Sequence, residues 1–136
     1  KTGRGVCVID LDTVMPGLSA WDFGDAVRAG ANTAAEDERD LSRVTFSLPM
    51  FKAYVGGYLR GLGGKLTRRE LDLLPLGAKL MTLECGMRFL TDHLSGDRYF
   101  HIHREGHNLD RARTQLRLVA CMERDWDAMV EIVKNA

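Results

Sequence analysis

The sequence predicts a mainly α-helical fold with one N-terminal β-strand. Three long stretches after residue 46 repeat their apolar residues at the spacing of an amphipathic helix. Residues 5–11 (GVCVIDL) have the β-branched, apolar character of a strand buried on both faces. A single strand cannot satisfy its own backbone, so we expect its partner strand to come from another chain or from an N-terminal half outside this sequence.

Composition indicates a single cytoplasmic domain. The 136 residues are one domain's worth of chain, and 45% hydrophobic residues are enough for a core. The formal net charge is zero, which argues against a nucleic-acid-binding surface. No stretch approaches the roughly 20 apolar residues of a membrane span, and no secretory h-region is present. Three cysteines without a C-x-x-C spacing indicate reduced thiols, as in a cytoplasmic protein.

The region between the strand and the long helices is short and polar. Residues 15–17 (MPG) predict a turn after the strand. Asp22 is the predicted N-cap of a short helix over residues 23–29. Residues 32–43 are rich in Asp and Glu and predict a loop.

The first long helix has clear start and stop signals. Ser47 followed by Pro49 begins it, because a Ser side chain caps free amides and Pro suits the first turn. A run of glycines, Gly61, Gly63 and Gly64, ends it. Its apolar residues recur at helical spacing: Leu48, Phe51, Val55, Tyr58 and Leu62.

The second long helix begins at a capping box, in which Thr67 and Glu70 satisfy free amides reciprocally. Pro75 predicts a kink or a break within it, and residues 95–97 (SGD) end it. The apolar stripe by which this helix would pack alternates steps of three and four residues: Leu73, Leu76, Leu80, Leu83, Met87, Leu90 and Leu94.

The third long helix follows a short extended stretch over residues 98–102. It begins at Asn108 and runs nearly to the last residue. Glu123 interrupts its apolar stripe and would need a partner if it were buried. The stripe consists of Leu109, Ala112, Leu116, Val119, Trp126, Val130 and Val133.

Two acidic residues follow the predicted strand at the point where it ends. Asp10 and Asp12 are two residues apart, which places both on one face if the chain is still extended. Carboxylates at the carboxyl edge of a strand suit Mg²⁺, which prefers oxygen ligands and keeps several waters. The alternative is that both acids only cap the turn that follows.

Residues 9–25 (IDLDTVMPGLSAWDFGD) resemble a segment of the aminoglycoside-phosphotransferase-like (choline kinase-like) small-molecule kinases. The resemblance implies that Asp10 holds Mg²⁺, that Asp12 is the second acidic position and that Asp22 is a structural brace for the catalytic loop. One difference is that the family often has G-D-P where this chain has residues 17–19 (GLS). The implied fold is the C-terminal helical lobe of a protein-kinase-like fold, with one N-terminal strand or hairpin remnant.

Further runs resemble the N-acetylhexosamine 1-kinase branch of that family. They cover residues 25–28, 30–44, 86–100 and 107–115. The resemblance implies transfer of the γ-phosphoryl group of ATP, with Mg²⁺, to the anomeric hydroxyl of GlcNAc or GalNAc. By position, Arg88 and Tyr99 match residues that contact the sugar, and Arg28 is a third candidate for that role.

Each candidate sugar-binding residue also has an ordinary structural interpretation. Glu84, Arg88 and Asp92 are spaced like a surface charge ladder on a helix. Tyr99 could be a packed aromatic residue, and Arg28 could cap the C-terminus of its helix. A separate cluster of histidines is compact enough for zinc but lacks the usual zinc spacings, so loop contacts are the simpler explanation. Its members are His93, His101, His103 and His107.

The sequence lacks two motifs that an active kinase needs. It has no Gly-rich phosphate loop and no H-x-D-x-x-x-x-N catalytic loop. We therefore expect residues 1–136 to be the C-terminal lobe of a sugar kinase, inactive alone, whose surfaces exposed by truncation favour a dimer. The alternative is a helical binding or assembly module without catalysis.

Overall fold

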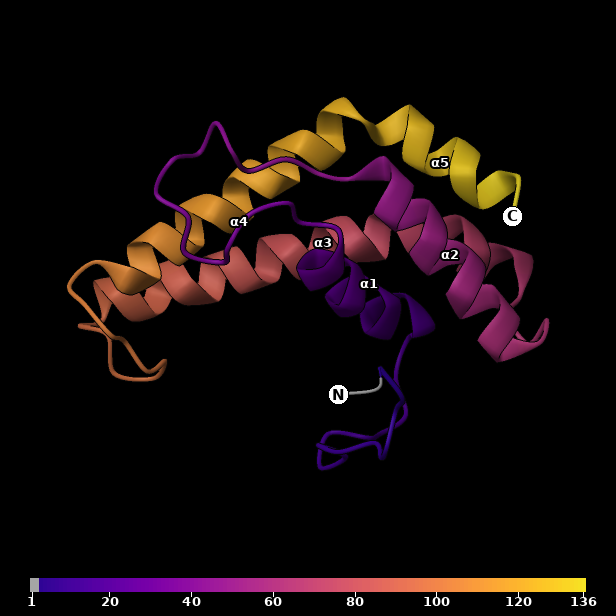
Figure 1. Ribbon diagram of the computed structural model, residues 1–136, viewed down its shortest axis with the longest axis horizontal. Coiled ribbons are helices and arrows are strands. Elements are labelled where there is room, and N and C mark those ends of the chain that lie inside the picture. Colours follow the sequence, from indigo (N-terminus) through magenta and orange to yellow (C-terminus); the bar gives the residue numbers. More distant parts are fainter. Residues whose placement is uncertain (1–2) are drawn as a thin grey trace.

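The protein is described by a computed structural model that covers residues 3–136 and contains five helices (Figure 1). They are α1 (Ser19–Gly30), α2 (Leu48–Leu62), α3 (Arg68–Leu94), α4 (His107–Arg124) and α5 (Trp126–Lys134). The predicted mainly α-helical class is confirmed. Within the described residues, no helix has both the length and the apolar character needed to cross a bilayer.

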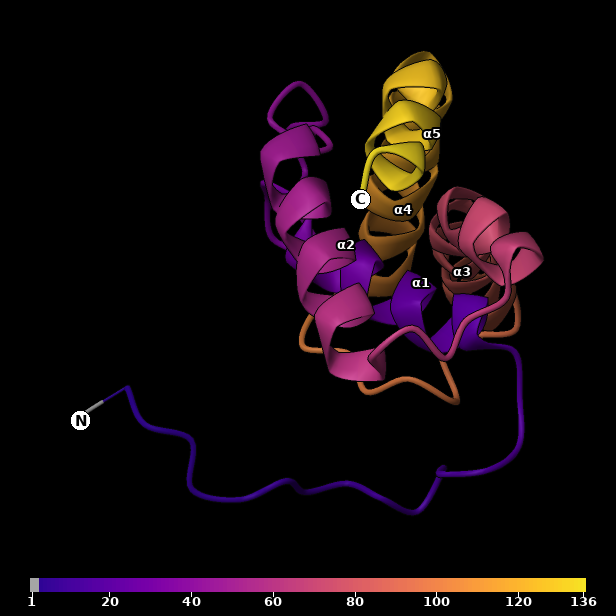
Figure 2. The ribbon, with the colours of Figure 1, turned by 90° about the vertical axis from the view of Figure 1, so that its right-hand side faces the viewer.

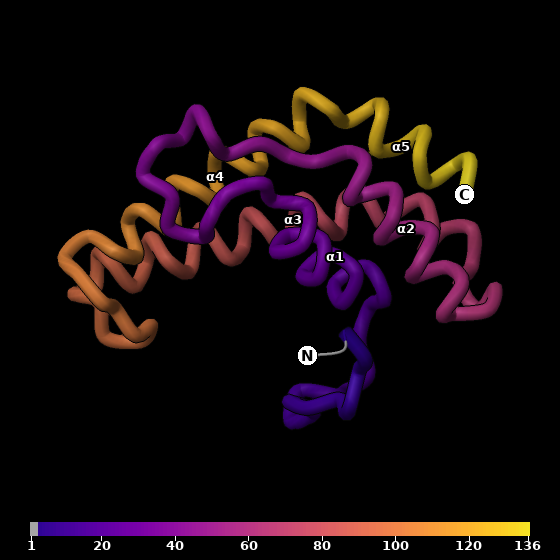
Figure 3. Tube along the Cα trace, viewed as in Figure 1, coloured from indigo at the N-terminus to yellow at the C-terminus, as the bar shows by residue number. Residues whose placement is uncertain are grey.

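The long helix α3 is the element on which the others assemble. α4 packs along it, α1 crosses it, and α5 contacts its N-terminal part, while α2 packs on α1 and α5. Figure 3 shows the segment between α1 and α2 arching over α4. That segment is closed at its base by a β-bridge between Asn32 and Phe46, and Thr33 and Thr45 hydroxyls lie 2.9 Å apart beside it.

The core lies where α1, α2, α4, α5 and the first half of α3 meet. Its centre contains aromatic residues in edge contact, with the rings of Phe23 and Phe51 5.9 Å apart. The largest fully buried side chains are Phe23, Phe51, Leu74, Leu118, Met122 and Met129. This core fixes the relation of α1 to α3, which together form the walls of the site described below.

Residues 3–18 form an extended segment that leaves the helical body, as Figure 2 shows. The predicted buried strand over residues 5–11 is wrong: Val6 is 97% exposed and Val8 80% exposed. The reason is that a strand cannot satisfy its own backbone amides and carbonyls. In the described part of the chain, no neighbouring strand pairs with this segment.

The predicted ends of the first two long helices are confirmed. The Ser47 hydroxyl accepts a hydrogen bond from the Met50 amide at 3.3 Å, and Gly63 ends α2 in the left-handed region with φ 57°. Both bonds of the capping box between Thr67 and Glu70 are present. Local chemistry therefore determines these ends.

The predicted N-cap role of Asp22 is wrong. α1 begins at Ser19, and Leu18 is its N-cap residue without a side-chain bond. Asp22 lies in the first turn, where an acidic side chain still favours the helix dipole. Of the kink or break predicted at Pro75, the break does not occur, because α3 continues through this residue, which is buried in the helix packing.

The apolar stripe predicted for α3 lies on the opposite side from the core. Leu73, Leu80, Met87 and Leu94 are exposed by 37%, 44%, 58% and 77%. The buried face instead consists largely of small or polar residues, and they allow α1 and α4 to approach the helix backbone closely. The residues of the buried face are Leu74, Pro75, Gly77, Ala78, Thr82, Gly86, Phe89 and Asp92.

The predicted single helix after residue 107 is two helices. α4 ends at Arg124 and α5 begins at Trp126, with Asp125 between them. Arg124 and Asp125 form an ion pair of 2.8 Å at the break. Glu123, which would need a partner if it were buried, is exposed. It nevertheless accepts a hydrogen bond of 2.8 Å from Lys79 on α3.

Candidate functional site

Two adjoining cavities lie beside the middle of α3. The arginine pocket, of about 690 Å³, is bounded by α1, α3, α4 and the loops at residues 36 and 100. Its lining includes Asp25, Arg28, Glu36, Glu84, Cys85, Arg88, Phe100, His101 and Arg111. The tyrosine pocket, of about 660 Å³, is lined by Met87, Thr91 and Tyr99 and shares Glu84, Arg88 and Phe100 with the first.

Arg88 stands on the wall between the two pockets and contacts Tyr99. One of its terminal nitrogens donates to the Tyr99 hydroxyl at 3.4 Å, and the guanidinium lies 5.6 Å from the centre of that ring. The same group is 5.3 Å from the Phe100 ring. A planar guanidinium stacks well on aromatic faces. The structure therefore brings together two of the three predicted sugar-binding residues.

The charge-ladder interpretation of Arg88 holds for only one of its two neighbours. Arg88 lies 3.6 Å from Glu84 on the exposed side of α3. Asp92 is 6% exposed and makes no ion pair with Arg88. Its carboxylate accepts 2.9 Å bonds from the backbone amides of Arg98, Tyr99 and Phe100, and from the Asn108 side chain.

Asp92 is thus the residue that shapes the loop carrying Tyr99. Three successive amides converge on one carboxylate, which fixes the backbone of residues 98–100 against α3. Burial disfavours the charged form, but the amides of Phe100, Tyr99 and Arg98 outweigh it and hold the pKa of Asp92 below 3.8. A lowered pKa means that this stabilisation is complete above pH 3.8 and is lost as the pH falls through the lowered value.

We expect an Asp92→Asn variant to be less stable than the wild type at pH 7, because Asn accepts fewer bonds and carries no charge. The difference should narrow as the pH falls below the pKa of an ordinary aspartate and should vanish below the lowered pKa of Asp92, where the wild-type side chain is also uncharged. Urea unfolding across a pH series measures this. The control is an Asp127→Asn variant, which is altered on the exposed face of α5. A stability difference between the wild type and Asp92→Asn that does not depend on pH would contradict the role given to Asp92.

Arg28 enters the arginine pocket from the last turn of α1. Its Nε donates to Asp25 at 2.9 Å and a terminal nitrogen donates to Glu36 at 3.2 Å. Glu36 also lies 3.5 Å from Arg111, whose terminal nitrogen donates to the His101 carbonyl at 3.2 Å. The side chain of Arg28 is thus held by carboxylates, which orients it toward the pocket rather than toward the end of its own helix.

The arginine pocket is balanced in charge. Three guanidinium groups, from Arg28, Arg88 and Arg111, face three carboxylates, from Asp25, Glu36 and Glu84. Such a lining suits a neutral ligand with many hydroxyl and carbonyl oxygens, because both donors and acceptors are present. Phe100 and, in the adjoining pocket, Tyr99 add ring faces against which an apolar surface can pack.

The predicted metal ligands lie in the extended segment that precedes α1. Asp10 and Asp12 are exposed, and Asp10 has a left-handed backbone with φ 62°. No group of three His, Cys, Asp or Glu side chains arranged for a metal occurs within residues 3–136. Thr13 lines the arginine pocket, so the segment carrying both acids passes its rim.

Asp22 is also exposed. It lies close to Tyr58 on α2. The Tyr58 hydroxyl donates to the Ser19 carbonyl at 2.9 Å. Burial, followed by the negative charge of Asp22, raises the pKa of Tyr58 to about 12. Asp22 therefore lies at the junction of α1 and α2 in the described structure.

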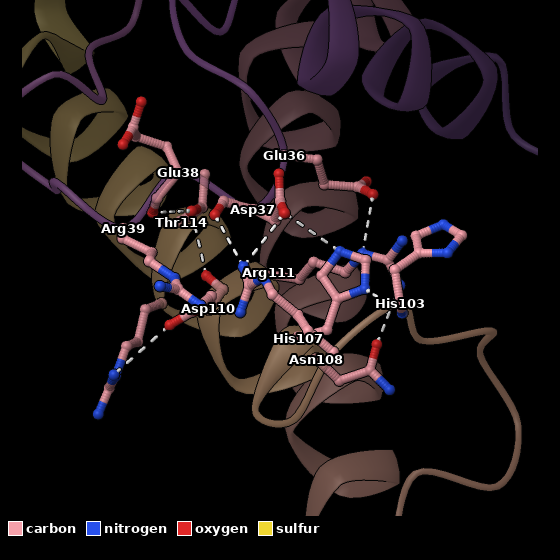
Figure 4. A network of polar contacts seen from close by, with 12 residues as sticks. Glu36, Asp37, Glu38, Arg39, His103, His107, Asn108, Asp110, Arg111 and Thr114 are labelled. Atoms are coloured by element: carbon pink, nitrogen blue, oxygen red, sulfur yellow. Dashed lines mark hydrogen bonds and ion pairs between the residues drawn. The ribbon is translucent and has the colours of Figure 1, made fainter.

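A polar network that sequence patterns did not reveal joins the loop at residues 36–39 to α4 (Figure 4). Asp37 accepts a 3.1 Å bond from Arg104 and lies 3.2 Å from Nε2 of His107, while the Thr114 hydroxyl donates to the Glu38 carbonyl at 3.1 Å. The acidic run at 36–38 is visible in the sequence, but Arg104, which donates to Asp37, is 67 residues away.

Three of the four histidines belong to the same region and make polar and ring contacts, while His93 lies 3.3 Å from Asp97 at the end of α3. Nδ1 of His107 accepts a 3.2 Å bond from the His103 amide, and the His101 and His103 rings are 4.7 Å apart. Burial and then Arg111 lower the pKa of His107, which keeps the ring neutral and able to accept. These contacts agree with the interpretation of the cluster as loop contacts.

No family model matches the chain. The functional interpretation therefore depends on the residues of the two pockets and on the sequence motifs given above.

Proposed function

We propose that this chain is the sugar-binding, C-terminal lobe of an ATP-dependent kinase that phosphorylates an N-acetylhexosamine at its anomeric hydroxyl. The observation that carries the proposal is the placement of Arg28, Arg88 and Tyr99 around two adjoining pockets. These three residues come from α1, α3 and the loop after α3. The sequence resemblance names Arg88 and Tyr99, and Arg28 is the third candidate. A charge-balanced lining with aromatic faces supports a neutral sugar as the ligand.

In the proposed complex, the arginines fix the sugar and the aromatic residues cover one of its faces. The fork of Arg88 donates to hydroxyl or acetamido oxygens, and Glu84 or Glu36 accepts from hydroxyl groups. Arg28 is held in place by Asp25 and Glu36, so it loses little freedom on binding. Orientation of this kind supplies much of the rate enhancement in phosphoryl transfer.

Asp10, with Asp12, would hold Mg²⁺ next to the phosphates of ATP. Two exposed carboxylates fit this ion, since Mg²⁺ usually takes one or two carboxylates and completes its shell with water and phosphate oxygens. The bound ion neutralises charge that develops on the transferred group. The sugar hydroxyl forms a bond to the γ-phosphorus while the bond to ADP breaks, and the base that takes the proton would belong to the catalytic loop outside this chain.

Titration of the ¹⁵N-labelled chain with GlcNAc and with GalNAc tests the proposed sugar site. We expect the backbone signals of Arg88, Tyr99 and Phe100 to shift in a saturable way, and glycerol at equal concentration to leave them unchanged. Shifts confined to the separate groove between α2 and α5, which Lys52 and Ile132 line, would contradict the assignment of the site, as would no shift at all.

A second candidate function is a helical binding or assembly module without catalysis. It is favoured by the exposed apolar residues on the outer face of α3, which offer a surface to a partner. A chain that binds neither GlcNAc nor GalNAc in the titration described above would support this candidate over the kinase.

A further inference from the structure

The outer face of α3 carries an apolar stripe that the described fold leaves open. It contains Leu73, Leu80, Met87 and Leu94, which are exposed by 37% to 77%. The half-buried residues of the same stripe are Leu76, Leu83 and Leu90. The opposite face of α3 is the one that packs on α1 and α4. The stripe extends over 22 residues from Leu73 to Leu94, or about 30 Å of helix, and therefore forms one continuous surface.

The spacing of the stripe identifies the kind of partner that would fit it. Its steps are three, four, three, four, three and four residues, which is the a/d pattern of a heptad repeat without interruption. A period of 3.5 residues keeps a seam in contact with a second helix over its whole length. A flat surface or an irregular peptide would not require this period, so the expected occupant is another α-helix.

The charges beside the stripe point to a second copy of α3 in parallel orientation. With Leu73 and Leu80 at a positions, Lys79 occupies a g position and Glu84 the following e position. In a parallel pair, g of one helix meets the next e of the other, so Lys79 would face Glu84 of the second copy. Two-fold symmetry would repeat this pair on the other side of the seam.

The antiparallel alternative lacks this complementarity. There, g positions meet g positions and e positions meet e positions, so Lys79 would not face Glu84. The parallel arrangement also uses side chains that are accessible, because Glu84 is 51% exposed and Lys79 27% exposed. Lys79 would then be shared between Glu123 of its own chain and Glu84 of the second copy.

We propose that two copies of this chain associate through the outer face of α3 as a parallel two-stranded coiled coil. Met87, in the middle of the stripe, also lines the tyrosine pocket. The second copy would therefore cover one edge of that pocket. The association depends on the stripe alone and stands whether or not the proposed sugar kinase activity is found.

Sedimentation velocity of the 136-residue chain over a concentration series tests the association. We expect a dimer whose dissociation constant rises about a hundredfold or more in a Leu80→Glu/Met87→Glu variant, since both charges would be buried in the seam. Circular dichroism checks that helix content is retained. The control is Met50→Glu, an equally exposed apolar residue on α2, which should leave the dimer unchanged.

Disulfide crosslinking determines the orientation and does not depend on how the charged variant folds. In a Cys7→Ser/Cys85→Ser background, Leu83→Cys places a thiol at a d position, where a parallel pair brings position 83 next to itself. We expect a covalent dimer under mild oxidation, and none from Met50→Cys. A monomeric chain, a dimer that the charged variant retains, or a dimer without the Leu83→Cys crosslink would each overturn the proposal.

Discussion

A Gly77→Ala variant should lose about 3 kcal/mol of unfolding free energy, the upper end of the usual overpacking cost. α1 and α3 cross with their backbones in close contact at this residue. A methyl group on Gly77 would overlap the Ala20 carbonyl, and one on Gly24 would overlap the carbonyl of Gly77. Because the obstacle is backbone, relief requires the two helices to move apart. Urea unfolding followed by circular dichroism measures the loss.

The matched control is Gly57→Ala on α2. Gly57 is also inside a helix, but a methyl group there meets open space. We expect this variant to be more stable than the wild type by about 0.5–1 kcal/mol, since Ala is the better helix former. Equal effects of the two substitutions would show that the α1–α3 crossing is looser than described.

An Arg88→Met variant should bind N-acetylhexosamine roughly tenfold to a hundredfold more weakly. Met fills a similar volume but removes the hydrogen bonds from the guanidinium, and bonds to charged groups contribute about 1.5–3 kcal/mol each. The substitution also removes the contact with the Tyr99 hydroxyl. Isothermal titration or the chemical-shift titration described above gives the affinity.

Arg69→Met is the control for Arg88→Met. Arg69 is an exposed arginine near the start of the same helix and lines neither pocket. Its replacement should leave sugar affinity unchanged. Unchanged affinity in Arg88→Met would instead assign that side chain to its pair with Glu84, as the charge-ladder interpretation holds.

Much of the helical framework was predictable because its signals are local. The cap at Ser47, the box at Thr67 and Glu70 and the left-handed Gly63 each act within a few residues. The face of α3 that packs was not predictable in this way. A hydrophobicity pattern is determined by leucines and not by glycines. α1 and α4 nevertheless approach α3 at Gly77 and Gly86.

The break between α4 and α5 illustrates the same limit. The apolar stripe continues across Asp125, so periodicity alone predicts one helix. Met122 before the break and Met129 after it are both fully buried in the same core, so the two helices pack on one side of the turn. Tertiary packing thus overrides a local preference for continued helix.

The candidate site was predictable only through residue identity. Arg88 and Tyr99 were named from a resemblance, and nothing in their spacing of 11 residues implies contact. The spacing of Asp92 predicts a surface ladder, whereas its partners are backbone amides, which carry no sequence signal. Asp10 and Asp12 were placed at the end of a strand that the described chain does not form.

The most direct test of the proposed function is ATP- and Mg²⁺-dependent phosphorylation of GlcNAc and GalNAc by the longer kinase to which, on this proposal, the chain belongs. We expect that enzyme to form the sugar 1-phosphate, an Asp10→Asn substitution to abolish the activity, and the 136-residue chain alone to show none. An inactive longer protein, an active Asp10→Asn enzyme, or phosphorylation by the 136-residue chain alone would contradict the proposal.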